Sequence, residues 1–340
     1  MMRLLLLSIA ALLALPAAAQ SEDRWIYEET HRIVGIDQRN IQFYLDWPAD
    51  GSNVPILLMI DGSGCVGQLR ERGRSFYRPG PDAPFRYARL QIEKPGVDPT
   101  ADFFDALTCS DEFHRHYTIA NRVADHLRVL QHLGAQADWW NGDLYLWGWS
   151  DGGDIGAQLL SYRPTTTRAV LGAMGGGFTM AEHFEDFWVC PEETTSDRPA
   201  CLADLRADFT RIADHLSRVG RWNGESPATW DSRLHSRLIA PLADNRVPLL
   251  IVHGEQDFDS VPVASARRLV DGLREAGNRH FAYWEIAGME HGWSSLPPGR
   301  KASARLGMYF WLFDLPIPPE LMPSLTERSI PALPLADASR

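Results

Sequence analysis

The chain has 340 residues, of which 45% are hydrophobic, and a formal net charge of −11 at pH 7. A chain of this size and apolar content can bury a large core, either as one domain with an insertion or as two smaller domains. Its acidity argues against nucleic acid as a partner, because the phosphates would be repelled, and favours a soluble protein.

The N-terminus has the pattern of a secretory signal. Residues 2–19 begin with one arginine, continue as an apolar run and end in Pro16 followed by small residues. Such an order is typical of a cleaved signal peptide. The apolar run is shorter than the roughly 20 residues of a membrane-spanning helix, so no stable membrane insertion is expected. We therefore predict that residues 1–19 are a signal peptide and that the mature protein is exported, to the periplasm or the extracellular medium.

Predicted strands and helices alternate along most of the chain. Residues 25–46 alternate apolar and polar side chains around a glycine-containing break, which predicts an edge hairpin. Further strands are predicted at 55–60, 86–92, 143–149, 168–173, 247–252 and 280–286, and helices at 119–133, 152–162, 262–276 and 301–313. Gly134 is expected to end the first of these helices. The alternation predicts an α/β fold with a mostly parallel, doubly wound sheet covered by helices on both faces.

One long segment interrupts this alternation. Residues 178–245 contain an amphipathic helix at 204–219, many aromatic residues and two cysteines. An insertion at this point would lie over the carboxyl ends of the strands as a helical cap. We therefore predict a core of residues 20–177 and 246–314, a cap of residues 178–245 and a Pro-rich C-terminal tail of residues 315–340.

The four cysteines predict two disulfide bonds. They are Cys65, Cys109, Cys190 and Cys201. An even number in an oxidising compartment favours disulfides over free thiols, although the sequence alone leaves three pairings open. We favour a bridge from Cys190 to Cys201, because it closes a short loop. The other bridge then joins Cys65 to Cys109. A zinc site is not expected, because the sequence has no Cys-x-x-Cys pair.

A G-x-S-x-G motif occupies residues 148–152, where a predicted strand meets a predicted helix. This is the context of a nucleophile elbow, a turn so tight that side chains two residues either side of the serine would collide. Gly148 and Gly152 remove those side chains. Ser150 would then lie at a helix N-terminus, where backbone N–H groups and the helix dipole favour negative charge. Ser150 is therefore the candidate nucleophile.

On this motif and its context, the chain resembles the α/β-hydrolase superfamily from about residue 40 to residue 314. The likeness is greatest to the esterase, dienelactone-hydrolase and prolyl-oligopeptidase-like groups. The resemblance implies an α/β-hydrolase fold and a catalytic triad in the chain order serine, acid, histidine. His291 follows the last predicted strand, where the family carries its base. Imidazole suits this role because its pKa near 6.5 allows it to take and return a proton.

The resemblance also implies the acid and the oxyanion hole. Asp257 lies at the family's distance from a strand-ending His-Gly pair, but one extra residue precedes the Val-Pro that follows, so Asp259 stays an alternative. The two N–H donors of the oxyanion hole would come from Asp151 and Ser63, with Gly64 possible if the loop shifts. The Ser63 loop has Asp61 where the family has histidine.

Together these features predict an exported serine hydrolase that cleaves a carboxylic ester through an acyl-enzyme intermediate. The expected partner is a small ester or peptide substrate, and no metal or organic cofactor is expected. Two alternatives stay open: a prolyl-oligopeptidase-like serine peptidase or aminopeptidase, and a non-catalytic hydrolase-fold protein that binds a ligand. The sequence does not specify the substrate or the oligomeric state.

Overall fold

The computed structural model describes residues 25–49, 53–68, 84–101, 109–162, 165–214 and 221–333. The predicted signal peptide, residues 1–19, lies outside these ranges. So does the last part of the predicted C-terminal tail, residues 334–340.

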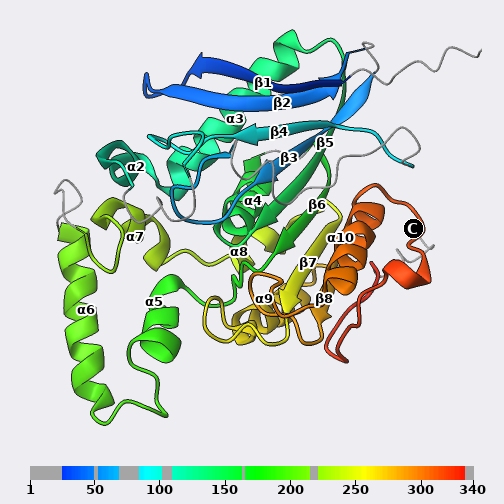
Figure 1. Ribbon diagram of the computed structural model, residues 1–340. Coiled ribbons are helices and arrows are strands. Elements are labelled where there is room, and N and C mark those ends of the chain that lie inside the picture. Colours follow the sequence, from blue (N-terminus) through cyan, green and yellow to red (C-terminus); the bar gives the residue numbers. More distant parts are fainter. Residues whose placement is uncertain are drawn as a thin grey trace, which may run out of the picture.

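An eight-stranded sheet in the order β1-β2-β4-β3-β5-β6-β7-β8 runs through the molecule (Figure 1). The hairpin strands β1 and β2 are antiparallel, as are β2 and β4, and the remaining pairs are parallel. The predicted mostly parallel α/β sheet is thus confirmed. The strands are β1 (Trp25–Val34), β2 (Asn40–Pro48), β3 (Val54–Ile60), β4 (Ala88–Ile92), β5 (Trp140–Trp149), β6 (Thr166–Gly172), β7 (Leu249–Gly254) and β8 (Phe281–Ile286).

Helices cover both faces of the sheet. Successive side chains of a strand point to opposite faces, so a strand that is apolar throughout needs a covering layer on each face. The α-helices described outside the segment between β6 and β7 are α2 (Asp111–His116), α3 (Ile119–Gln136), α4 (Asp151–Tyr162), α9 (Val263–Glu275) and α10 (Pro298–Leu312). Ile56 and Leu58 of β3 belong to the core shared with α3, α4 and α9. Leu57 and Met59 belong to the core shared with α10.

Helix α3 runs past the residue at which the sequence predicted its end. It begins after Thr118, whose side chain accepts a hydrogen bond from the Asn121 amide, and continues to Gln136. Gly134 lies inside it, because glycine lowers helix stability without removing a backbone hydrogen bond. The helix instead ends at Gln136, and the amide of the next residue, Ala137, still donates a hydrogen bond to the carbonyl of Leu133.

Between β6 and β7 the chain forms a group of helices with a small core of its own. Leu205, Phe209 and Ile212 share one buried face of α6, at the spacing of an amphipathic helix. They pack with Phe184 and the half-buried Trp230. In the view of Figure 1, α5, α6 and α7 lie on the side of the molecule away from α10. The helices of this segment are α5 (Met180–His183), the π-helix η2 (Phe184–Trp188), α6 (Arg198–Asp214), α7 (Pro227–Leu234) and α8 (Ile239–Ala243).

After α10 the chain returns along the edge strand β8. A short 3₁₀ helix, η3 (Pro319–Leu321), comes first. Ile330 and Tyr283 then exchange two backbone hydrogen bonds, of 2.7 and 2.8 Å. The Ala287 amide also donates to the carbonyl of Ser324, at 2.9 Å. The described part of the tail therefore covers an otherwise open sheet edge.

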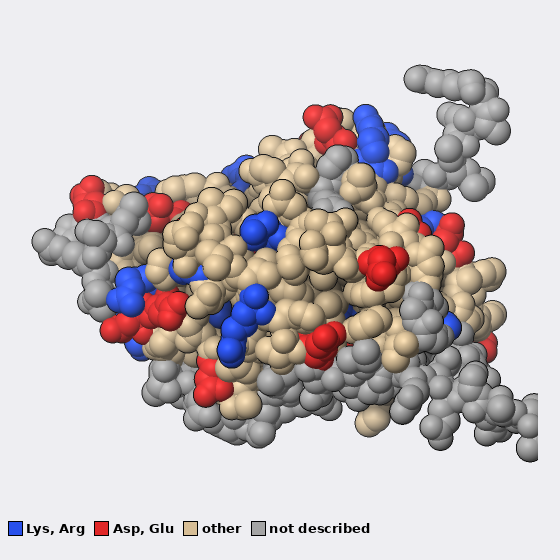
Figure 2. Space-filling view, turned by 90° about the horizontal axis from the view of Figure 1, so that it is seen from above, with Lys and Arg blue, Asp and Glu red and all other residues tan. Residues whose placement is uncertain are grey.

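Charged residues of both signs are interspersed with uncharged ones on the face of the molecule seen in Figure 2. The acidic side chains therefore do not form a single negative patch over the described part of that face. Among the described residues, no helix is long and apolar enough to cross a membrane.

Candidate active site

Ser150 lies at a tight turn between β5 and α4, in a backbone conformation that side chains disfavour. Its φ is +56°. A Cβ atom at Gly148 would lie 2.3 Å from the carbonyl oxygen of Gly152, and one at Gly152 would lie 2.1 Å from that of Ile60. The Ser150 amide donates to the carbonyl of Gly172, at 2.8 Å, which ties the turn to β6. The two motif glycines therefore permit the close approach that leaves the serine at the turn.

Ser150, His291 and Asp257 form one hydrogen-bonded chain. His291 Nε2 lies 3.0 Å from Ser150 Oγ, and His291 Nδ1 lies 2.7 Å from Asp257 Oδ2. These residues are 141 and 34 positions apart in the sequence. A hydroxyl, an imidazole and a carboxylate in this order can activate the hydroxyl as a nucleophile, because the carboxylate orients the imidazole.

The loop after β7 brings Asp257, and not Asp259, to His291. Asp257 is 2% exposed, and its other carboxylate oxygen accepts a hydrogen bond from the Val261 amide, at 3.0 Å. Asp259 is exposed, and its carbonyl accepts a hydrogen bond from Trp188 Nε1. The extra residue noted before Val261-Pro262 in the sequence therefore lies after Asp257, the residue whose carboxylate contacts His291.

His253, at the end of β7, supports the same loop. Its side chain is fully buried, with Nε2 at 2.9 Å from the carbonyl oxygen of Val261 and at 3.4 Å from Asp257 Oδ2. Burial lowers the pKa of His253, so the neutral form that donates one hydrogen bond is favoured. This histidine therefore contacts both the acid and the loop that carries it.

The loop after β3 lies against Ser150. A Cβ atom at Gly62 would lie 3.3 Å from the Cβ atom of Ser150, so a side chain there would crowd the hydroxyl. Ser63 lines the same pocket as Ser150 and Asp151. Asp151 is the first residue of α4, where amides have no acceptor one turn earlier in the helix. The two predicted oxyanion donors thus belong to two different segments that line the pocket with Ser150.

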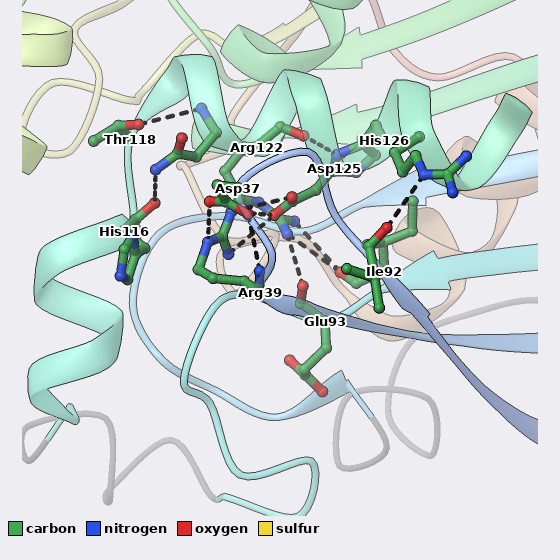
Figure 3. Close-up of polar contacts among 12 residues, drawn as sticks. Asp37, Arg39, Ile92, Glu93, His116, Thr118, Arg122, Asp125 and His126 are labelled. Carbon is green, nitrogen blue, oxygen red and sulfur yellow. Dashed lines mark hydrogen bonds and ion pairs between the residues drawn. The ribbon is translucent and has the colours of Figure 1, made fainter.

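Two buried cations hold Asp61, the first residue of that loop. Lys94 forms an ion pair with its carboxylate and also donates to the carbonyl of Gly64, at 2.7 Å. Arg122 Nη2 lies 3.5 Å from the other carboxylate oxygen. In Figure 3, Arg122 extends from α3 toward Glu93, whose carbonyl accepts its hydrogen bond at 3.0 Å. Asp61 is therefore held in place by two buried cations at the start of this loop.

The side chain of Asp151 has partners that the sequence did not indicate. Arg233, on α7, binds it with two hydrogen bonds of 2.8 and 3.1 Å, and the Tyr117 hydroxyl donates to it as well. Burial alone would raise the pKa of Asp151, but Arg233 and these hydrogen bonds lower it. Since Arg233 is 82 residues away from Asp151 in the sequence, no local motif indicates this ion pair.

A pocket of about 350 Å³ opens beside Ser150 and His291. Much of its apolar lining comes from the segment between β6 and β7, so this segment shapes the space in which a substrate would bind. These apolar residues include Phe178, Met180, Trp188, Trp230 and Leu238.

Burial shifts the pKa of several polar side chains that line the same pocket. Burial, with the nearby charge of Asp151, raises the pKa of Asp154 well above its usual value. Burial also raises the pKa of Glu225 and lowers that of His183 to about 4. The uncharged forms of Asp154 and His183 are therefore favoured in this pocket. Among the described residues, no cluster of three or more histidine, cysteine or acidic side chains could hold a metal ion.

Two disulfides close segments next to this site. Cys65 pairs with Cys109, and Cys190 pairs with Cys201, which is the pairing favoured from the sequence. Cys65 directly follows the loop that contains Ser63 and packs against Tyr117. The first disulfide is therefore adjacent to the loop beside the nucleophile.

Comparisons with solved structures place the chain in one fold group. Est1E from Butyrivibrio proteoclasticus, solved with ferulic acid, has a TM-score of 0.55 at 15% identity, over 84% of this chain and 99% of that one. A candidate dienelactone hydrolase from Klebsiella pneumoniae has a TM-score of 0.54 at 14% identity, over 86% and 99%. An acylaminoacyl peptidase from Pyrococcus horikoshii has a TM-score of 0.54 at 14% identity, over 84% and 41%.

These likenesses show that the chain has the α/β-hydrolase fold, as the resemblance in its sequence predicted. At identities this low, they show the fold alone. The chain spans less than half the length of the peptidase. No protein-family model and no curated protein matches the sequence.

Proposed function

We propose that the protein is an exported serine hydrolase that cleaves a carboxylic ester through an acyl-enzyme intermediate. The observation that carries the proposal is the hydrogen-bonded chain Ser150–His291–Asp257 beside a pocket. Burial favours the neutral forms of Asp154 and His183, which suits an uncharged ester more than an anionic substrate.

In the proposed reaction, His291 Nε2 takes the proton of Ser150 Oγ as the oxygen attacks the ester carbonyl carbon. The carbonyl oxygen becomes negatively charged and accepts hydrogen bonds from the amides of Asp151 and Ser63. Asp257 stabilises the resulting imidazolium, which then gives its proton to the departing alcohol. His291 then deprotonates a water molecule, which attacks the carbonyl carbon of the acyl-enzyme. The proton taken from this water passes from His291 to Ser150 Oγ as the carboxylic acid leaves.

The proposal assigns residues 178–245 to a cap over the active site. Support comes from the pocket lining, since Phe178, His183, Trp188 and Trp230 all belong to this segment. Residues 20–177 and 246–314 form the core, and residues 315–340 the tail. Export rests on the predicted signal peptide and is supported by the two disulfides, which form and persist in oxidising compartments.

A serine peptidase is the second candidate, because the same three residues can cleave amides and the fold is equally like that of an acylaminoacyl peptidase. The test compares the hydrolysis of 4-nitrophenyl acetate and butyrate with that of alanyl and N-acetylalanyl 4-nitroanilides by the purified protein. The esterase proposal expects a higher kcat/KM for the esters, with turnover abolished in Ser150→Ala and retained in the exposed control Ser161→Ala.

Faster hydrolysis of the anilides, also dependent on Ser150, would contradict the esterase proposal and establish the peptidase. Lack of turnover with both substrate classes by the folded protein would contradict both and favour a ligand-binding protein.

A further inference from the structure

Three buried side chains connect the two segments that contain the proposed oxyanion donors. Lys94 Nζ lies 5.7 Å from the centroid of the Tyr117 ring, and the guanidinium carbon of Arg233 lies 4.7 Å from it. Lys94, Tyr117 and Arg233 are 2%, 1% and 6% exposed. Cations at these distances are attracted to an aromatic ring, and more strongly when they are shielded from water. We call these three residues the oxyanion clamp.

At one end of the clamp, Lys94 holds the loop after β3 on both sides of Ser63. Its ammonium group binds the carboxylate of Asp61, two residues before Ser63, and donates to the carbonyl of Gly64, one residue after it. Gly64 has a φ of +80°, a conformation that glycine adopts without strain. One buried ammonium group thus contacts the loop on both sides of the Ser63 amide.

At the other end, Arg233 and Tyr117 hold Asp151, whose own amide is the second donor. The guanidinium group binds both carboxylate oxygens, a geometry that fixes orientation as well as distance. The Tyr117 hydroxyl donates to one of the same oxygens. The charge of Lys94 also contributes to lowering the pKa of Asp151, so the two ends of the clamp influence one another electrostatically.

An oxyanion hole depends on such control of position. Its donors stabilise the transition state only when they lie about 2.7–3.1 Å from the place that the oxyanion will occupy, and removing one donor costs about 10²–10³ in kcat. Here the two amides belong to segments that are separated in the sequence. The clamp joins those segments through side-chain contacts.

We propose that Lys94, Tyr117 and Arg233 are positioning residues that hold the amides of Ser63 and Asp151 at the spacing an oxyanion requires. This inference rests on the proposed function, since an oxyanion forms only in acyl transfer. It gives Arg233, which comes from the proposed cap, a role in the chemistry as well as in the shape of the pocket.

The test uses the variants Lys94→Met, Tyr117→Phe and Arg233→Met, each measured for kcat, KM and inhibition by an alkyl trifluoromethyl ketone. Ser150 adds to this ketone and its proton passes to His291, so the resulting hemiketal carries an oxyanion in the hole. We expect kcat to fall about 10²-fold in Lys94→Met and Arg233→Met, and about tenfold in Tyr117→Phe, with KM within about threefold of wild type. The inhibition constant of the ketone should rise in parallel with KM/kcat.

Arg89→Met is the matched control, because it removes another buried cation. Arg89 is 2% exposed and pairs with Asp46, between β4 and β2. We expect this variant to lose thermal stability while its kcat and its ketone inhibition constant stay within about twofold of wild type. If Lys94→Met does not fold, Tyr117→Phe, which loses only a hydroxyl, provides the test.

The clamp is refuted if folded clamp variants bind the ketone as tightly as wild type, or if Arg89→Met weakens ketone binding as much as they do. Failure of the wild-type protein to hydrolyse any ester is a different result, because it would contradict the proposed function on which the clamp depends.

Discussion

Two hydrogen bonds give His291 a defined orientation, and each has a different consequence. The bond from Nδ1 to Asp257 favours the tautomer that leaves Nε2 free to accept a proton. The bond at Nε2 points that nitrogen at Ser150 Oγ. Because Asp257 is buried and also held by the Val261 amide, its carboxylate has little freedom to turn away.

The choice between the two candidate acids can be tested by a matched pair of substitutions. Asp257→Asn keeps the size of the side chain but removes the charge that selects the tautomer, so we expect kcat to fall about 10³–10⁴-fold. Asp259→Asn makes the same change two residues away, on an exposed side chain, and should leave kcat within about twofold of wild type. Steady-state ester hydrolysis measures both, and the reverse pattern would assign the acid to Asp259.

Sequence reasoning reached Ser150, His291 and Asp257 because each lies in a local pattern, at a strand end with glycine nearby. It did not reach Lys94, Tyr117 or Arg233, because their partners lie far away in the sequence and none is part of a motif. The aspartate at position 61 was recognised only as a departure from the family's loop. Its ion pairs with Lys94 and Arg122 depend on how β4 and α3 pack, which no local pattern shows.

The buried carboxyl of Glu93 allows a prediction of how the stability of the protein varies with pH. Burial, with the nearby charge of Asp61, raises the pKa of this carboxyl from 4.5 to about 7. Between these two values the folded protein binds more protons than the unfolded chain. The free energy of unfolding should therefore fall as pH rises through this window, by up to about 3 kcal/mol from this group.

Urea unfolding at about pH 4.5 and about pH 8 should show this decrease in wild type, and Glu93→Gln should lack about 3 kcal/mol of it. Glu112→Gln, an exposed change of the same kind on α2, serves as the control and should behave as wild type. Equal pH dependence in wild type and Glu93→Gln would show that this carboxyl does not titrate as described.

The two disulfides stabilise elements with different relations to the site. Cys190–Cys201 joins the turn after η2 to α6 across 11 residues, within the segment between β6 and β7. Cys65–Cys109 spans 44 residues and ties the loop after β3 to the region before α2. On the chain-entropy model, the two bonds contribute about 3 and about 4 kcal/mol. Only Cys65–Cys109 adjoins the loop that contains Ser63.

We therefore expect different effects on activity when each disulfide is replaced by two serines. Loss of Cys65–Cys109 should lower both the free energy of unfolding and kcat, because the Ser63 loop loses its covalent anchor. Loss of Cys190–Cys201 should lower stability while changing kcat less. Chemical denaturation and ester kinetics at a temperature where both variants are folded measure these effects. A larger loss of kcat in the variant that lacks Cys190–Cys201 would contradict the proposed link between Cys65–Cys109 and the Ser63 loop.

Most elements could be predicted from the sequence because their periodicity is strong. The buried strands are short apolar runs, and α9 and α3 have clear apolar faces. The largest differences from the prediction are at helix boundaries: α3 continues through Gly134, α6 begins at Arg198 instead of near residue 204, and α10 begins at Pro298 instead of residue 301. Boundaries are the least certain part of a helix prediction because most of the stability of a helix comes from tertiary packing, which the local pattern does not show.

At the scale of the whole molecule, the sheet order explains how distant residues meet. Ser150 follows β5, Asp257 follows β7 and His291 follows β8, while Ser63 follows β3. Parallel strands present their carboxyl ends at one edge of a sheet, and ligands of such sheets bind there. The segment between β6 and β7 begins at the same edge and lines the pocket, so the fold brings the candidate catalytic residues and the pocket walls to one place.

The most direct test of the central claim is labelling of the purified protein with a fluorophosphonate, followed by mass spectrometry of its peptides. An activated serine attacks this reagent, and unactivated serines do not. The account predicts one labelled residue, Ser150, with labelling lost in Ser150→Ala and strongly reduced in His291→Ala. A folded wild-type protein that is not labelled, or that is labelled at a different serine, would contradict it.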